Sequence, residues 1–163
     1  MRKTIVGVIG PGRDAGTEEI EAAFEVGKLI ALEGWVLLSG GRDVGVMDAV
    51  NKGAKAADGL TVGILPSGDT ASMSTAVDIP IVTSMGQARN NINVLSSEVL
   101  IACGLGAGTA SEIALAIKAQ KKVILLGGNR EGRAFFKSLG KDGVHLVDNP
   151  HQAIDTAKRL IGL

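Results

Sequence analysis

Ser97-Glu-Val-Leu-Ile-Ala-Cys103 runs directly into Gly104-Leu-Gly-Ala-Gly-Thr-Ala-Ser-Glu112 and then into Ile113-Ala-Leu-Ala-Ile-Lys-Ala-Gln120. The first part is an apolar run of strand length, glycines punctuate the second, and the third has the spacing of an amphipathic helix. Such a strand, turn and helix leave the first backbone N–H groups of the helix without partners. Because the helix dipole adds partial positive charge there, this stretch predicts an anion-binding turn.

The same order of strand, glycine turn and helix occurs twice more, earlier in the chain. Residues 4–9 end in Gly10-Pro-Gly-Arg13, and residues 35–38 end in Ser39-Gly-Gly-Arg42. Strands that alternate with helices predict an α/β fold, with a single doubly wound, mostly parallel, Rossmann-like sheet and helices on both faces. The carboxyl ends of parallel strands share one edge, where the ligand crevice lies. We therefore expect all three turns to meet at that edge.

Local signals place the other elements. Thr17, Asn129 and Asn149 each stand where a helix cap is expected, the last before a first-turn proline. The polar, aperiodic segment Ser67–Asp78 indicates a mobile loop that could close over a ligand. Further strands are expected at residues 60–65, 79–82, 123–126 and 144–147, and a short helix is expected at 87–95. Pro80 suits an edge position or the start of its strand.

The composition limits the possible classes of function. With 163 residues, the chain is expected to form one domain, residues 1–163, that buries a core without metal or disulfide. Its 17 basic and 17 acidic residues give zero net charge, which argues against nucleic-acid binding. A single cysteine, no signal-peptide pattern and no apolar run of about 20 residues predict a cytoplasmic protein without membrane contact.

Three arginines, Arg13, Arg42 and Arg89, lie in or beside the loops at the expected ligand edge. Guanidinium groups suit phosphate oxygens, and Arg89 is favoured because its helix immediately precedes the expected strand Ser97–Cys103. Asn90 and Asn93 are more simply interpreted as polar helix surface. The expected ligand-binding residues are Gly10, Pro11, Gly12, Arg13, Ser39, Gly40, Gly41, Arg42, Arg89, Asn90, Gly104, Gly106, Ala107, Gly108, Thr109 and Glu112.

Thr109 and Glu112 have the spacing of a capping box, in which each side chain bonds the backbone N–H of the other. A carboxylate at a phosphate-binding turn could instead act as a general base or orient a sugar hydroxyl. The spacing favours the cap. Cys103 is interpreted as a buried hydrophobic residue, and His145 and His151 lack the partners of a metal site, so no metal is expected.

Four motifs together resemble a known superfamily. They are Ser39-Gly-Gly-Arg-Asp-Val-Gly-Val-Met-Asp-Ala49, Gly59-Leu-Thr-Val-Gly-Ile-Leu-Pro66, Arg89-Asn90 and Gly106-Ala-Gly-Thr-Ala-Ser-Glu112. The superfamily includes the LOG cytokinin-activating phosphoribohydrolases, often labelled possible lysine decarboxylases. Within it, the motifs are most similar to the branch that contains the molybdenum cofactor carrier proteins.

This resemblance implies a protein that binds molybdenum cofactor, a phosphorylated pterin, as cargo without turning it over. It also implies a homo-oligomer, a dimer or a tetramer, and molybdoenzymes that receive the cofactor as partners. On this interpretation no residue is catalytic. The main alternative is a phosphoribohydrolase that cleaves the N-glycosidic bond of nucleoside 5′-monophosphates, for which the resemblance implies Arg89 and Glu112 as the catalytic residues. A weaker alternative is a nucleotide-sensing module that binds nucleotides without turnover. The enzymes, however, carry Pro-Gly-Gly where this chain has Gly104-Leu-Gly106, and Lys where it has Asn90.

Overall fold

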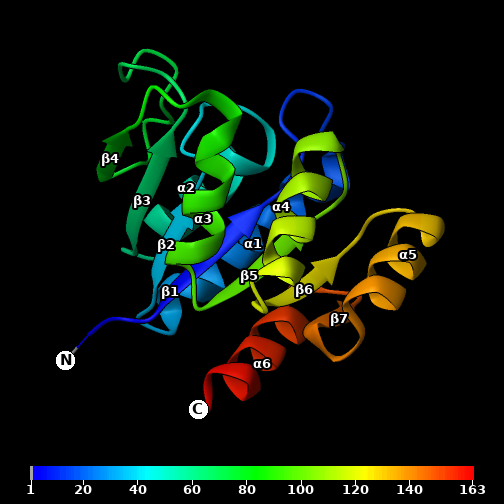
Figure 1. Ribbon diagram of the computed structural model, residues 1–163. Helices are drawn as coiled ribbons and strands as arrows, with labels where there is room; N and C mark the ends of the chain where they lie inside the picture. Colours follow the sequence, from blue (N-terminus) through cyan, green and yellow to red (C-terminus); the bar gives the residue numbers. More distant parts are fainter. Residues whose placement is uncertain (1) are drawn as a thin grey trace.

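Seven strands form one parallel sheet in the computed structural model, which describes residues 2–163 (Figure 1). The strand order is β4-β3-β2-β1-β5-β6-β7, and every neighbouring pair is parallel. The predicted α/β class and sheet are therefore confirmed. The strands are β1 (Ile5–Ile9), β2 (Val36–Ser39), β3 (Leu60–Leu65), β4 (Ile79–Val82), β5 (Val99–Cys103), β6 (Lys122–Leu126) and β7 (Val144–Val147).

Helices cover both faces of the sheet. One buried apolar cluster joins α1, α2 and α6 to the sheet, and a second joins α3, α4 and α5 to the other face. Figure 1 shows α3 and α4 side by side over that second face. The helices are α1 (Thr17–Leu32), α2 (Gly45–Ala56), α3 (Asn90–Ser96), α4 (Ala107–Lys118), α5 (Arg130–Gly140) and α6 (Pro150–Ile161), with 3-10 turns η1 (Gly86–Arg89) and η2 (Lys141–Gly143).

The chain adds strands outward from β1 on one side, from β2 to β4, and then on the other side, from β5 to β7, so the strand order has its switch point between β1 and β5. β1 pairs with β2 on one side, Gly7 opposite Leu38, and with β5 on the other, Ile9 opposite Ala102. The turns after β2, β1 and β5 therefore lie next to one another at one edge, which confirms the prediction that the glycine turns meet there. A crevice outside the strand ends at such a switch point is the usual ligand site of this fold class.

The caps show where local signals succeed and where one fails. The Asn129 side chain accepts from the Gly132 N–H at 2.9 Å, and that of Asn149 accepts from the Gln152 N–H at 3.0 Å, as predicted. The prediction for Thr17 is wrong, because Thr17 is already the first residue of α1 and Gly16 is its N-cap. The Glu19 carboxylate accepts from the Gly16 N–H at 2.8 Å and supplies the missing cap interaction.

Segment Ser67–Asp78 is held by specific contacts. The Ser74 N–H donates to Gly41 O at 2.9 Å, and its hydroxyl donates to the Asp48 carboxylate at 2.7 Å. The Lys55 ammonium group reaches Asp78 at 2.9 Å. These contacts attach the segment to α2 and to the turn after β2, and its closure over a ligand stays a prediction. None of the helices in residues 2–163 has both the length and the apolar character needed to span a membrane.

Helices α1 and α2 approach each other through glycines. A Cβ at Gly53 would lie 1.9 Å from the Phe24 carbonyl oxygen, and one at Gly27 would lie 2.0 Å from that of Val50. Both contacts are with backbone atoms, which cannot rotate away. Because α2 directly follows the turn after β2, this close packing also positions one wall of the crevice.

We predict that Gly53→Ala lowers the free energy of unfolding by about 2 kcal/mol, because the helices must separate. The gain in helix propensity from alanine, up to about 1 kcal/mol, does not offset this cost. Urea denaturation measures the change. Gly108→Ala is the matched helical control, because a Cβ there meets no atom within 4 Å. Equal losses in both variants would contradict the packing argument.

Candidate functional site

A pocket of about 150 Å³ lies at the switch point, between the three glycine turns. Its floor is the end of β1, and its walls come from the turns after β1 and β2, from η1 and α3, and from the first turns of α4. The volume suits a phosphate group rather than a whole cofactor-sized ligand. The pocket is lined by Val8, Ile9, Gly10, Gly12, Gly40, Arg42, Met47, Gln87, Arg89, Asn90, Gly108, Thr109 and Glu112.

Helix α4 begins with unsatisfied donors. Its N-cap is Gly106, which has no side chain to accept from the helix, and the Ala110 N–H is the first to bond within it, to Gly106 O at 2.8 Å. Within residues 2–163, the N–H groups of residues 107–109 have no acceptor. Two of these residues, Gly108 and Thr109, line the pocket. The start of α4 thus presents backbone donors and positive dipole charge to the pocket.

The capping-box prediction for Thr109 and Glu112 is wrong. Because α4 begins at Ala107, Thr109 is its third residue and Glu112 lies in its second turn, out of reach of the helix start. Both side chains are buried, and the Thr109 hydroxyl oxygen has no partner within residues 2–163. A buried hydroxyl without a partner costs free energy, so its place at the pocket needs an explanation other than capping.

Glu112 is a buried carboxyl group at the pocket wall. Its side chain accepts from Asn93 Nδ2 at 2.9 Å, and the residue is only 7% exposed. Burial raises the pKa of Glu112 to about 7, against the opposing effects of the Asn93 hydrogen bond and the Arg89 charge. The group is therefore a mixture of acid and carboxylate near neutral pH, which is the range for proton transfer.

Arg89 is buried beside it and held by backbone and side chain. Its guanidinium donates to Asn90 Oδ1 at 2.6 Å and to Gly40 O at 3.5 Å, and its Nε is buried without a partner in residues 2–163. Burial lowers the pKa of Arg89, as does the neighbouring charge of Arg42, whereas Glu112 raises it. A Cβ at Gly40 would lie 2.6 Å from Met47 Sδ and 2.9 Å from the Arg89 guanidinium, so a larger residue there would require both side chains to shift.

The prediction that Asn90 and Asn93 are polar helix surface is also wrong. They are 5% and 1% exposed, so they are not polar helix surface. Asn90 Nδ2 also donates to the Ser111 hydroxyl at 3.3 Å, while Asn93 bonds Glu112. Both amides thus face α4 from α3, three residues apart and on one side of the helix. That spacing was the available signal, but only the neighbouring helix shows that this side is buried.

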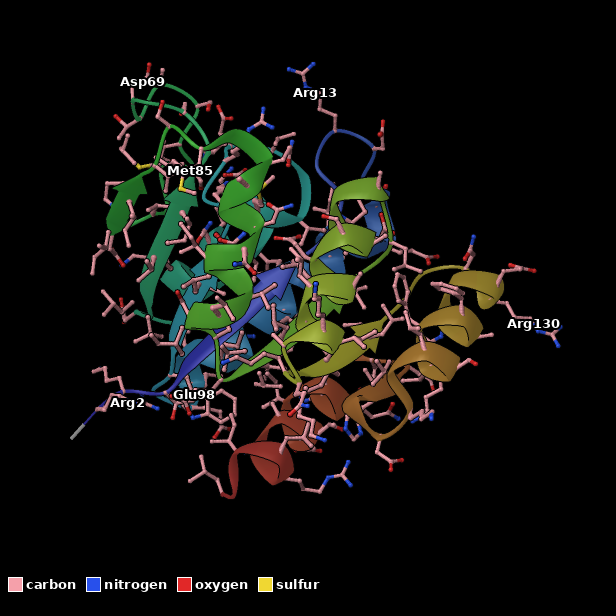
Figure 2. The ribbon with its side chains drawn as sticks, viewed as in Figure 1. Arg2, Arg13, Asp69, Met85, Glu98 and Arg130 are labelled. Carbon is pink, nitrogen blue, oxygen red and sulfur yellow. The ribbon has the colours of Figure 1, made fainter. Side chains whose placement is uncertain are left out.

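Nine of the sixteen expected ligand-binding residues line the pocket, and seven do not. Arg13 is exposed and points away from the fold at the end of the loop after β1 (Figure 2). The Ser39 hydroxyl accepts from the Gly41 N–H and from Asn51, so its role is internal. The seven residues outside the lining are Pro11, Arg13, Ser39, Gly41, Gly104, Gly106 and Ala107.

Four lining residues escaped the sequence argument. Val8 and Ile9 contribute as the buried end of β1. Met47 contributes from the first turn of α2, and Gln87 contributes from η1. None of these residue types indicates a ligand by itself. Their position could have been inferred only from the strand order, which places the ends of β1 and β2 side by side.

A larger cavity, of about 760 Å³, lies on the other side of the turn after β5. Its charged lining residues are Asp14, Glu18, Glu19 and Asp148, which would repel an anion. Cys103 also borders it, but burial, with the charge of Glu19, raises the pKa of this thiol to about 12 and keeps it protonated. Across residues 2–163, no group of three or more His, Cys, Asp or Glu side chains is placed to hold a metal ion. The smaller pocket is the better anion site.

Known proteins match this chain over nearly its whole length. The sequence model of the SLOG cluster4 family matches residues 3–154. The structure of a molybdenum cofactor binding protein from the phototrophic bacterium Rippkaea orientalis is 55% identical, with a TM-score of 0.97 and 99% of each chain covered. That of a molybdenum cofactor carrier protein from Chlamydomonas reinhardtii is 51% identical, with a TM-score of 0.95 and 99% of this chain and 100% of that chain covered.

An enzyme is also similar to part of the chain. A cytokinin riboside 5′-monophosphate phosphoribohydrolase from Mycobacterium tuberculosis is 37% identical over 100 residues, which are 59% of this chain and 52% of that protein. Together these matches confirm the resemblance seen in the motifs, both to the LOG superfamily and to its carrier branch.

We predict that Glu112 makes stability depend on pH. Between pH of about 4.5 and 7 the group is protonated in the folded chain and ionised in the unfolded chain, so raising the pH favours unfolding. The full effect is roughly 3 kcal/mol. Glu112→Gln removes it, and urea denaturation at several pH values measures the difference. Exposed Glu21→Gln is the control, and a wild-type-like pH profile for Glu112→Gln would contradict the prediction.

Proposed function

The chain belongs to the SLOG cluster4 family, and we propose that it binds, protects and carries molybdenum cofactor as cargo in the pocket at the switch point. The observation that supports this most strongly is the similarity to two molybdenum cofactor binding and carrier proteins, each more than half identical over the full length. The pocket adds a chemical argument, because its donors and cations suit the phosphate of a phosphorylated pterin.

The terminal phosphate of the cofactor would bind at the start of α4. The N–H groups of residues 107–109 and the Thr109 hydroxyl, after a small rotation, would donate to its oxygens, and Arg42 and Arg89 would balance its charge. Because the pocket holds only about 150 Å³, the pterin would extend outward, past Met47 and Gln87. The chain has only three Phe and one Trp, so hydrogen bonds rather than stacked rings would hold it.

A second candidate is hydrolysis of a nucleoside 5′-monophosphate. It is favoured by one observation, that Arg89 and Glu112 line the same pocket and that burial gives Glu112 a pKa of about 7. Two departures from the enzymes weaken it. Asn90 stands in place of a lysine, and its side-chain oxygen accepts a hydrogen bond from Arg89. The turn before α4 has Leu105 where the enzymes have glycine. We therefore place carriage first.

We also propose that the chain acts as a cytoplasmic homo-oligomer, a dimer or a tetramer, that delivers the cofactor to molybdoenzymes. Edge strand β4 supports self-association, because Ile79, Ile81 and Val82 are each 44% exposed on it and Met85 follows at 49%. An exposed apolar edge of this kind is usually covered in soluble proteins. Light scattering coupled to size exclusion measures the oligomer.

The carrier proposal predicts which arginine matters. Chain purified from cells that make the cofactor should contain molybdenum and pterin, and Arg42→Gln and Thr109→Val should lower this content about tenfold. Arg13→Gln is the matched control, because Arg13 is exposed outside the pocket. Metal analysis and fluorescence of the oxidised pterin measure the content. Equal loss in all three variants, or no cofactor in the wild type, would contradict the proposal.

The enzyme candidate is tested with adenosine monophosphate and a cytokinin ribotide. If the chain is a carrier, chromatography detects no more free base with the wild type than with Glu112→Ala. Release of base that depends on both Glu112 and Arg89 would instead establish the hydrolase.

A further inference from the structure

A groove of about 330 Å³ follows the outer edge of β7, far along the sheet from the pocket at the switch point. It is lined by Lys137 of α5, by His145, Leu146 and Val147 of β7, and by Thr156 and Arg159 of α6. It shares no lining residue with the pocket at the switch point. None of its lining residues is acidic.

The cations of this groove are held by neutral groups of the chain. The Lys137 ammonium donates to the carbonyls of Lys141 and Val144, each at 2.8 Å, and Arg159 donates to the Thr156 hydroxyl at 3.0 Å. Neither residue forms an ion pair within residues 2–163, and the same is true of nearby Lys122. Cations are favourable in the last turn of a helix, which accounts for the presence of both residues. It does not account for their convergence on one groove.

His145 is a neighbour of these cations. It is half-buried, and its Nε2 is buried without a partner within residues 2–163. Burial lowers the pKa of His145, and so do the charges of Lys137 of α5, Lys122 of β6 and Arg159 of α6, against the raising effect of the Asp142 backbone of η2. The pKa of this imidazole is lowered by burial first and then by three neighbouring cations, which indicates a local excess of positive charge in a chain whose net charge is zero.

We propose that this groove binds a small dianion of the phosphate class, such as a phosphate ester, at a site separate from the cargo pocket. Arg159 has unused guanidinium donors and Lys137 has a third ammonium proton, which together suit the oxygens of a tetrahedral anion. An added peptide strand fits less well, because Lys137 and Arg133 already bond the carbonyls of Val144 and Val147. The volume lies within the range of small-molecule sites.

The experiment uses the two histidines of the chain as reporters. Sulfate is the probe, because it is a dianion of phosphate shape whose charge does not change across the titration of an imidazole. NMR follows the imidazole resonances of His145 and of exposed His151 as pH is varied, in sulfate and in chloride at equal ionic strength. Sulfate in the groove should raise the pKa of His145 and leave that of His151 unchanged, and the shift should saturate with concentration.

Variants separate binding from a general salt effect. Arg159→Gln should raise the sulfate dissociation constant, measured from the His145 response, by roughly fivefold. Lys137→Gln should do the same, and Lys158→Gln is the matched control, since Lys158 of α6 pairs with Glu33 outside the groove.

Equal shifts of both histidines, no saturation, or equal effects of all three variants would overturn the proposal. Because Lys137 also bonds backbone carbonyls, Arg159→Gln decides the outcome if Lys137→Gln unfolds. Thr109→Val in the cargo pocket should leave the His145 response unchanged.

Discussion

The parallel pairing of β1 with β5 is the constraint on which the rest of the structure depends. It joins two strands that are distant in sequence, with Val6 opposite Val99 and Ile9 opposite Ala102, and it reverses the order in which the chain fills the sheet. The connection to β5 is fitted closely to β1. Ser97, the C-cap of α3, donates its hydroxyl to Asn93 O, and a Cβ on Gly7 would lie 2.2 Å from the same hydroxyl. This pairing places the start of α4 beside the turns after β1 and β2.

Charge in this neutral chain is sorted among its cavities. The pocket at the switch point combines Arg42, Arg89 and the backbone donors at the start of α4 with Glu112, whose pKa is raised to about 7. The charged residues that line the larger cavity beside it are all acidic. Anionic cargo would therefore be directed to the smaller space. Glu112 is compatible with such cargo because burial favours its neutral form, and Asn93 keeps it in place in either form.

The sequence was sufficient to predict the sheet and the meeting of the glycine turns, because both follow from the order of the apolar runs. Pro80 was compatible with the edge position of β4. It was insufficient for α4, where the Thr109 and Glu112 spacing fits a cap but the helix starts two residues before Thr109. Asn93 could not be placed either, since its burial depends on the contact between α3 and α4. Arg13 and Arg42 follow similar turns, and only the folded loops separate the exposed one from the one in the pocket.

The most direct test of the central claim is a structure of the chain with molybdenum cofactor bound. The account predicts that the cofactor phosphate accepts from the N–H groups at the start of α4, beside Thr109, with Arg42 and Arg89 facing it and the pterin extending outward past Gln87. Cofactor whose phosphate lies instead in the cavity bordered by Glu18 and Glu19, or in the groove along β7, would contradict it.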